Sequence, residues 1–441
     1  MLSLRETVRS QADRSITPLE LLAESRATTT ARDDDLGAFL SRFETESSDL
    51  AGRLGAAGSR HDTLTMPLRG IPVAVKDLIY TTEAPTTGQS RGFGSTRPQL
   101  EGTAVRRLRL AGANVVGKTT TMELGAGVLE EGSTSVFPRN PWDRARWPGG
   151  SSSGSAIAVA SGMALAALGT DTGGSIRCPA ALCGVTGFKP THGAVPADGM
   201  IRGGESYEVI GPLARTAEDC DLLHQVLVGT TVRPVEEMTP AGLRVGVVRD
   251  LSDVDDEVWQ TLGAAEDVFA HAGSAVSTAR VDGWTDLAAV AGLGTVAEHF
   301  ATMSDQFAER WSDFGPSARR IIGTGALLGA SDYLLVQAAR RALCMRAARV
   351  FDDVDVLITP TTPRDAPLHT EMHELRRFIP LTSPVNALGW PAVSIPMGLS
   401  ARGLPLGMQI IGPPGSDRFV LGAAHAYQGL TRWHLADCTQ T

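Results

Sequence analysis

Apolar and polar positions form successive blocks along the chain, and the blocks predict helices and strands in turn. The first sixty residues have a helical pattern, and residues 15–20 (SITPLE) open one helix with hydroxyl caps and a proline in the first turn. Residues 103–111 are also helical in pattern. By contrast, residues 70–76 (GIPVAVK) and 113–117 (ANVVG) are short β-branched runs, which are typical of buried strands.

The second half of the chain continues this alternation. Residues 242–248 (GLRVGVV) and 354–360 (VDVLITP) predict strands, and 255–350 is mostly helical in pattern. Residues 155–168 are rich in alanine and predict a buried helix whose small side chains permit close packing. We found no internal repeat and no linker. The pattern therefore predicts one large α/β domain in which residues 1–60, a helical segment, pack on a core formed by 61–441.

Composition narrows the function classes. The chain has 441 residues, 42% of them hydrophobic and 20% charged, so it can bury a large core. Its net charge of −9, without any block of basic residues, argues against nucleic acid as a partner. The first residues lack the apolar core of a secretory signal, and no apolar run is long enough to span a bilayer. We therefore expect no membrane association, and five cysteines without a CxxC pair favour a reducing, cytoplasmic location.

Two serine-glycine clusters, residues 149–155 (GGSSSGS) and 169–177 (GTDTGGSIR), flank the alanine-rich run. Gly173 and Gly174 can turn the backbone so that successive N–H groups face one concavity, as an oxyanion requires. Ser175 would then attack beside these donors. On these residues alone, a plain tight turn between two elements explains the glycines equally well.

A serine nucleophile needs a base, and Lys76 is the candidate because it ends the buried run 70–76. Burial favours the neutral amine, which can accept a proton. Lowering the pKa of a lysine to roughly 7 corresponds to about 5 kcal/mol, so its surroundings must be dry and well organised. The alternative interpretation is a lysine paired with the neighbouring Asp77.

Three motif matches point elsewhere and are weak. Residues 112–119 fit the P-loop pattern, but a helical stretch precedes them and the loop positions themselves look like a strand. Residues 150–154 fit the G-x-S-x-G nucleophile elbow, with Ser152 as nucleophile, but no buried strand comes before them. His369 and His373 lie in a Pro-flanked loop and are best explained as surface residues, so we expect no metal and no cofactor.

Taken together, these residues resemble the amidase signature family. Both serine-glycine clusters match the family's signature stretch, and the spacing of Lys76, Ser151 and Ser175 fits its Ser-Ser-Lys triad. The resemblance covers nearly the whole chain and is weakest over 230–330. The flanking segments that match are residues 70–77 (GIPVAVKD), 117–119 (GKT), 187–193 (GFKPTHG), 211–216 (GPLART), 386–396 (NALGWPAVSIP) and 403–409 (GLPLGMQ).

The resemblance implies a fold and a set of roles. The fold would be a central twisted mixed β-sheet flanked by helices. Ser175 would be the nucleophile, Ser151 a bridging serine on a cis peptide bond, and Lys76 the terminal base. The amides of Thr172, Gly173, Gly174 and Ser175 would form the oxyanion hole, and Asp171 and Arg177 would support the loop.

The chain departs from the family pattern at several positions outside the triad. Ser153 replaces a glycine, Thr120 replaces a common asparagine, and Glu208 stands where the family often has an aspartate in Ser-x-Asp. Residues 133–141 are shorter than usual, which puts the shape of the pocket in doubt. None of these changes removes a triad residue.

We therefore expect an amidase that cleaves a carbon–nitrogen bond of a small molecule through an acyl-enzyme. One alternative is the glutamine-hydrolysing component of a tRNA-dependent amidotransferase, although the Phe-Asp-Glu stretch of such proteins is absent near Asp417. Another is a non-hydrolytic member, an amide synthase, acyl transferase or pathway scaffold. The expected partners are a small amide substrate and, at most, a second copy of the chain.

Overall fold

A single mixed β-sheet runs through the whole molecule. The computed structural model describes residues 3–13, 15–56, 66–94, 97–128, 136–235 and 238–438. Within them, eleven strands hydrogen-bond in the order β1-β3-β2-β4-β6-β5-β10-β11-β9-β7-β8. The strands are β1 Phe39–Arg42, β2 Pro72–Lys76, β3 Asn114–Thr119, β4 Ala166–Asp171, β5 Thr186–Lys189, β6 Val209–Ala214, β7 Arg244–Val248, β8 Ala275–Ala279, β9 Val356–Pro360, β10 Ala392–Leu399 and β11 Pro405–Ile411.

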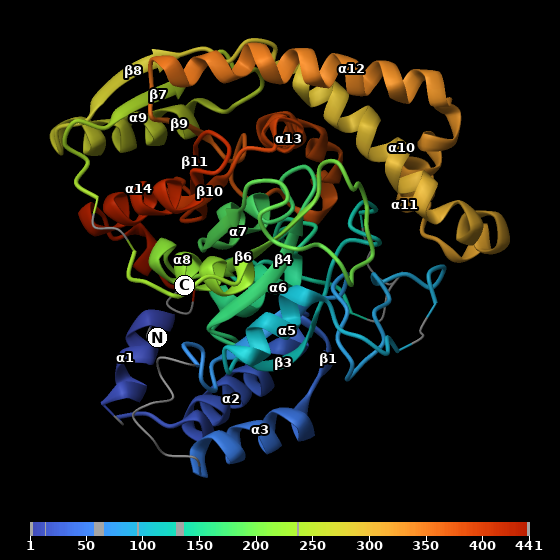
Figure 1. Ribbon diagram of the computed structural model, residues 1–441, viewed down its shortest axis with the longest axis vertical. Helices are drawn as coiled ribbons and strands as arrows, with labels where there is room; N and C mark the ends of the chain where they lie inside the picture. The colour runs from blue at the N-terminus through green and yellow to red at the C-terminus, as the bar shows by residue number, and fades with distance from the viewer. Residues whose placement is uncertain are drawn as a thin grey trace.

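Helices cover the sheet, as Figure 1 shows. The N-terminal helices lie at one end of the molecule, and α10 to α12 form an outer layer at the other. The α-helices are α1 Leu4–Ala12, α2 Pro18–Leu36, α3 Glu44–Ala56, α5 Thr103–Leu110, α6 Ser153–Ala160, α7 Arg177–Cys183, α8 Ala217–Val228, α9 Asp256–His271, α10 Trp284–Arg310, α11 Pro316–Gly323, α12 Ala330–Ala347, α13 Ile379–Leu388 and α14 Asp417–Leu430. The 3-10 helices are η1 Trp311–Asp313, η2 Thr324–Leu327, η3 Ala348–Asp352, η4 His369–Arg377 and η5 Trp433–Leu435.

The predicted fold class, an α/β domain with a mixed sheet flanked by helices, is confirmed. The strands β2, β3, β7 and β9 lie where the sequence predicts them, and so does the helix α5. The helix α2 begins as expected, with Thr17 as its cap, Pro18 in the first turn and Glu20 closing a capping box.

Two predictions of secondary structure were wrong. The first sixty residues are not all helical, because β1 pairs with β3 and extends the sheet. The alanine-rich run is not one helix, because α6 ends at Ala160 and β4 begins at Ala166. Gly162, at φ +74°, and the turn around it separate the two elements. The boundary predicted at residue 60 lies outside the described residues, as do residues 133–135.

Among the described residues, no single helix has the length and the apolar composition needed to cross a bilayer. One sharply bent pair, residues 316–327 with 330–352, meets these two criteria only when its parts are joined.

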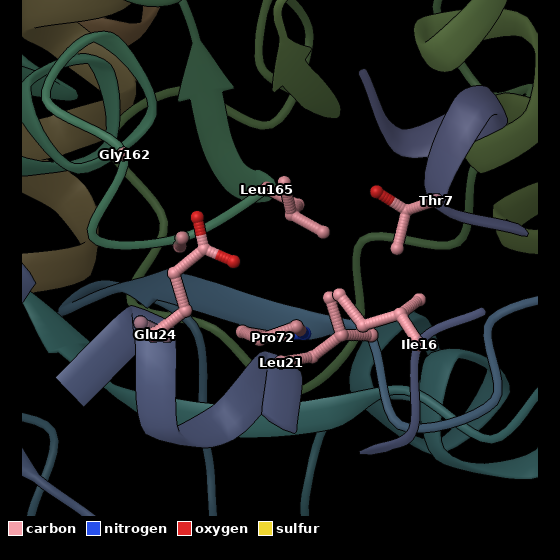
Figure 2. A pocket seen from close by; sticks show the side chains of 9 residues that line it. Thr7, Ile16, Leu21, Glu24, Pro72, Gly162 and Leu165 are labelled. Atoms are coloured by element: carbon pink, nitrogen blue, oxygen red, sulfur yellow. The ribbon is translucent and has the colours of Figure 1, made fainter. Parts of the chain in front are cut away.

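A small cavity of about 40 Å³ lies between the N-terminal helices and the sheet (Figure 2). Its walls include Leu21 and Glu24 of α2, Pro72 of β2 and Leu165 before β4. The walls are mostly apolar, and Glu24 is exposed. The candidate catalytic residues identified from the sequence do not line this cavity, so it is not their substrate site.

Candidate active site

The sheet brings the two halves of the candidate site together at one edge. Strands β2 and β4 are parallel neighbours, with Val75 opposite Leu168, so their C-terminal ends lie side by side. Lys76 ends β2, and Thr170 and Asp171 end β4. The carboxyl ends of parallel strands are the usual place for ligands in open α/β sheets.

Lys76 is completely buried and contacts hydroxyl groups. Its Nζ donates to Ser151 Oγ at 2.7 Å and to Thr170 Oγ1 at 2.9 Å. Burial lowers the pKa of Lys76 to about 7, against the opposing charges of Glu208 and Asp171. A lysine with this pKa is neutral in a large share of molecules at neutral pH and can accept a proton.

The alternative that pairs Lys76 with Asp77 is wrong. The carboxylate of Asp77 lies 3.4 Å from Lys118 Nζ and accepts a hydrogen bond from Thr87 Oγ1 at 2.6 Å. Adjacent residues of a strand point to opposite faces of the sheet, which separates the two side chains. Lys118 itself belongs to β3 and is fully buried, so the P-loop match at residues 112–119 is a strand.

The first serine-glycine cluster holds Ser151 beside the lysine. The peptide bond between Gly150 and Ser151 is cis, as the resemblance implies, and Ser151 is buried. The next residue, Ser152, is wholly enclosed, and its amide donates to the carbonyl of Ser175 at 3.0 Å. Its hydroxyl bridges the backbone of Thr170. Ser152 thus joins the two clusters, whereas the nucleophile of an α/β-hydrolase elbow must be exposed.

The second cluster forms a tight turn that leads into α7, and Ser175 lies in it partly exposed. In the described part of the chain, no hydrogen bond joins Ser175 Oγ to Ser151 Oγ. The amide of Gly174 donates to Asp171 Oδ1 at 2.8 Å, so it supplies no free donor for the predicted oxyanion hole. The amides of Thr172, Gly173 and Ser175 have no acceptor among the described residues, which leaves three donors.

Gly174 allows the backbone to form this turn, although its amide does not serve as an oxyanion donor. Its φ is +120°, a value that side chains rarely allow, and a Cβ there would collide with Thr382. Thr382 Oγ1 donates to the carbonyl of Gly173 at 2.6 Å and fixes the turn from the α13 side.

Asp171 and Arg177 form a buried brace under this turn. Arg177 Nε and Nη2 each donate to the Asp171 carboxylate at 3.0 Å, and Asn386 Nδ2 donates to it at 2.8 Å. Burial favours the protonated acid, but the charge and hydrogen bonds of Arg177 hold the pKa of Asp171 well below its usual value. Both residues are committed to each other, which suits the supporting role that the resemblance implies.

Sequence reasoning missed the part that Glu208 has in this site. Its side chain is 6% exposed, and its carboxylate accepts a hydrogen bond from the amide of Gly203 at 2.8 Å. Burial raises the pKa of Glu208, although the charge of Lys76 and the hydroxyls of Thr170 and Thr172 act in the opposite direction. The only signal in the sequence was that Glu208 replaces the family's common aspartate.

Within the described ranges, no group of three or more His, Cys, Asp or Glu side chains could hold a metal ion. His369 begins η4, and its ring lies tilted against that of Phe137 with 4.7 Å between the ring centroids; His373 is exposed beside Glu374. The two histidines therefore have ordinary protein contacts.

Comparisons with known proteins identify the family of this chain. The model of the family described as Amidase matches residues 20–421. The A subunit of the glutamyl-tRNA(Gln) amidotransferase of Chloroflexus aggregans is 37% identical over 95% of this chain and 94% of its own length. A crystal structure of an amidase superposes with a TM-score of 0.89 and 32% identity, covering 97% of this chain and 99% of that one. The A subunit of the Thermotoga maritima amidotransferase superposes with a TM-score of 0.79 and 30% identity, covering 96% and 94%. The chain therefore belongs to the amidase signature family, whose enzymes act on amides.

Proposed function

We propose that this protein is a free-standing amidase that hydrolyses a small-molecule amide through an acyl-enzyme on Ser175. The observation that carries the proposal is the 2.7 Å hydrogen bond from a completely buried lysine to Ser151, in a loop tied to that of Ser175. The substrate is the one partner that the reaction needs.

The proposed reaction begins with proton transfer toward Lys76. Neutral Lys76 takes the proton of Ser151, and Ser151 takes the proton of Ser175 as Ser175 Oγ attacks the amide carbon. For this transfer, Ser175 must turn its hydroxyl toward Ser151 when substrate binds. Hydrogen bonds of this kind often form only in the complex with substrate.

The tetrahedral intermediate then collapses. Its oxyanion would accept hydrogen bonds from the free amides of Thr172, Gly173 and Ser175, and each such donor is worth about a hundred- to a thousandfold in rate. The carbon–nitrogen bond breaks as the proton held on Lys76 returns through Ser151 to the leaving nitrogen. Water repeats the sequence on the acyl-enzyme, which releases the carboxylic acid and restores Ser175.

A fluorophosphonate probe tests the assignment without knowledge of the substrate. Such a probe phosphonylates an activated serine, and mass spectrometry of the labelled peptide identifies the residue. We expect labelling at Ser175, and none in Ser175→Ala. Modification of Ser152 in place of Ser175 would overturn the assignment.

The glutamine-hydrolysing component of an amidotransferase is a second candidate, favoured by the 37% identity to the Chloroflexus aggregans protein. Against it, Asp417 is already committed here, since its carboxylate accepts hydrogen bonds from the amide and hydroxyl of Thr191. It also lies 3.6 Å from His224. A carboxylate occupied in this way is poorly placed to select the ammonium group of glutamine.

Ammonia release from primary amides, aryl amides and glutamine separates the candidates. Efficient turnover of an amide other than glutamine by the purified chain alone would support the free-standing amidase. Activity confined to glutamine, and weak without companion proteins, would support the amidotransferase component. Acyl transfer to an added amine without hydrolysis would favour an amide synthase.

A further inference from the structure

We propose that Glu208 is a positioning residue of this active site, whose negative charge supports the protonated form of Lys76 through Thr170. The inference rests on the proposed function of Lys76 as the base. It assigns to the chain a fourth group in the relay, at a position where the family often has the shorter aspartate.

Hydrogen bonds and a strand pairing place Thr170 between Lys76 and Glu208. Ser151 Oγ and Thr170 Oγ1 both accept from Lys76 Nζ. Thr170 lies opposite Ile210 in the pairing of β4 with β6, so Glu208, two residues before Ile210, lies on the same face of the sheet as Thr170. A threonine that accepts from the lysine still has its own proton to donate. Thr170 is therefore the polar group through which the charge of Glu208 would act on the lysine.

Glu208 is the carboxylate that remains available to this lysine. The two acidic side chains that act on Lys76 are Glu208 and Asp171. Asp171 is neutralised by two hydrogen bonds from Arg177, and the charge of Lys189 also lowers its pKa. The carboxylate of Glu208, by contrast, accepts a hydrogen bond from the amide of Gly203 and, within the described residues, forms no ion pair with an arginine.

The loop that binds Glu208 lies against α10. The ring of His299 packs against Gly203, whose amide binds Glu208, and burial lowers the pKa of His299 to about 4. This histidine is therefore neutral near pH 7 and supplies no cation. Among these groups, Lys76 is the one whose charge changes during the proposed reaction.

A buried ammonium forms on Lys76 when Ser175 attacks, and it must be stabilised without water. The charge of Glu208 supplies that stabilisation inside a site of low polarity, where opposite charges act strongly. The same charge raises the pKa of Lys76 in the free enzyme. Removing the charge should therefore have two effects: slower attack, and a lysine that loses its proton at lower pH.

Glu208→Gln tests this proposal with the fluorophosphonate probe. The rate of labelling of Ser175 is measured against pH, and the parent rate should rise through one ionisation near 7. In Glu208→Gln we expect this ionisation to move about one to three units toward lower pH. The plateau at high pH should fall by about tenfold or more.

Glu298→Gln is the matched control. Glu298 accepts from the amide of Ser206 at 2.8 Å and so holds the same loop, but its second partner is Tyr333, not the lysine. A change in loop packing alone would lower the plateau in both variants and leave the ionisation in place. An unmoved ionisation in Glu208→Gln would therefore overturn the proposal.

If Glu208→Gln does not fold, Glu208→Asp is used to test the proposal instead. The shorter side chain keeps the charge but withdraws it from Thr170, so the ionisation should move in the same direction by a smaller amount. No movement would again overturn the proposal. Lys76→Met separates this result from the proposed function, because rapid labelling in that variant would show that Lys76 is not the base, whatever Glu208 does.

Discussion

Two buried lysines at the ends of neighbouring strands show how this fold distinguishes a structural charge from a reactive one. Lys76 ends β2, and Lys118 lies beside it on the parallel strand β3, opposite Val75. Both side chains are fully buried. Lys118 faces the carboxylate of Asp77 at 3.4 Å, whereas the hydrogen-bond partners of Lys76 are two hydroxyls.

The pKa values of Lys76 and Lys118 differ because their hydrogen-bonding and charged partners differ. Burial lowers the pKa of Lys118 to about 8, with the adjacent Asp77 opposing the shift, and it lowers the pKa of Lys76 to about 7. Lys118 therefore stays a cation at neutral pH and ties β3 to Thr86 and the carbonyl of Ile79. Burial alone does not make a base; the lysine must also lack a close counter-ion.

The largest effects are expected when each of the two lysines is replaced by methionine. Lys76→Met removes the base, so we expect amide turnover to fall about 10²- to 10⁴-fold with the fold intact. Lys118→Met leaves Asp77 buried and unpaired, so we expect a loss of about 3–5 kcal/mol in stability and ordinary turnover per folded molecule. Turnover with an amide substrate and urea denaturation of both variants measure the two effects.

The reverse pattern would refute this assignment. If Lys118→Met were folded and inactive while Lys76→Met kept its activity, the base would lie on β3. Ser175→Ala serves as the inactive reference, because a partly exposed hydroxyl contributes little to packing and should cost no more than about 1 kcal/mol.

A smaller effect is expected when Ser151, one of the two hydroxyl partners of Lys76, is replaced. Ser151→Ala should lower amide cleavage about 10²- to 10⁴-fold, because the leaving nitrogen receives its proton through that hydroxyl. An activated ester should be affected less, since its leaving group departs without a proton. Rates for the amide and for the activated ester of the same acid give the ratio.

Ser152→Ala is the control for this ratio. Ser152 sits in the same loop, but its hydroxyl forms its hydrogen bonds with the backbone of Thr170, not with Lys76. We expect a small loss of stability, about 1 kcal/mol, and an unchanged ratio of ester to amide rates. An equal fall for both substrates in Ser151→Ala would argue against proton delivery by Ser151.

The residues of the site show what the sequence could predict and what it could not. Lys76, Ser151 and Ser175 could be identified from the sequence because each lies at the end of a strand or beside glycines. Local sequence patterns reveal such positions. The sequence did not reveal that Gly174 gives its amide to Asp171, since that bond depends on the fold of the turn.

The same limit explains the errors in the fold. The strand β1 was read as helix because its pairing with β3 comes from residues far along the chain. Likewise, Glu208 comes to the same face of the sheet as Thr170, a hydrogen-bond partner of Lys76, through the antiparallel pairing of β4 with β6, whose first residue, Val209, follows it. Contacts between distant segments produce no hydrophobic periodicity in the sequence, so local patterns do not reveal them.

The pH dependence of activity tests the state of Lys76 directly. Only the neutral amine can accept a proton, so kcat/KM should rise with pH through a single ionisation near 7. Below that pH, activity should fall about tenfold per unit. A profile that is flat from about pH 5 to 8 would show that the reacting lysine is not the one described here.

The smallest expected effect is the contribution of Lys76 to stability. Its pKa is about 7 in the folded chain and about 10.4 when unfolded, so between these values the unfolded chain binds more protons. The cost of burying the cation is therefore fully present below pH 7 and is relieved as pH rises toward 10. Lys76→Met lacks this cost, so its advantage in unfolding free energy over the parent should shrink above pH 7, by at most about 1.4 kcal/mol per unit. Urea denaturation of both proteins at about pH 6.5, 7.5 and 8.5 gives the difference. A difference that stays constant across this range would mean that Lys76 keeps its proton, as Lys118 does at neutral pH, and that the contrast between the two lysines is not one of protonation.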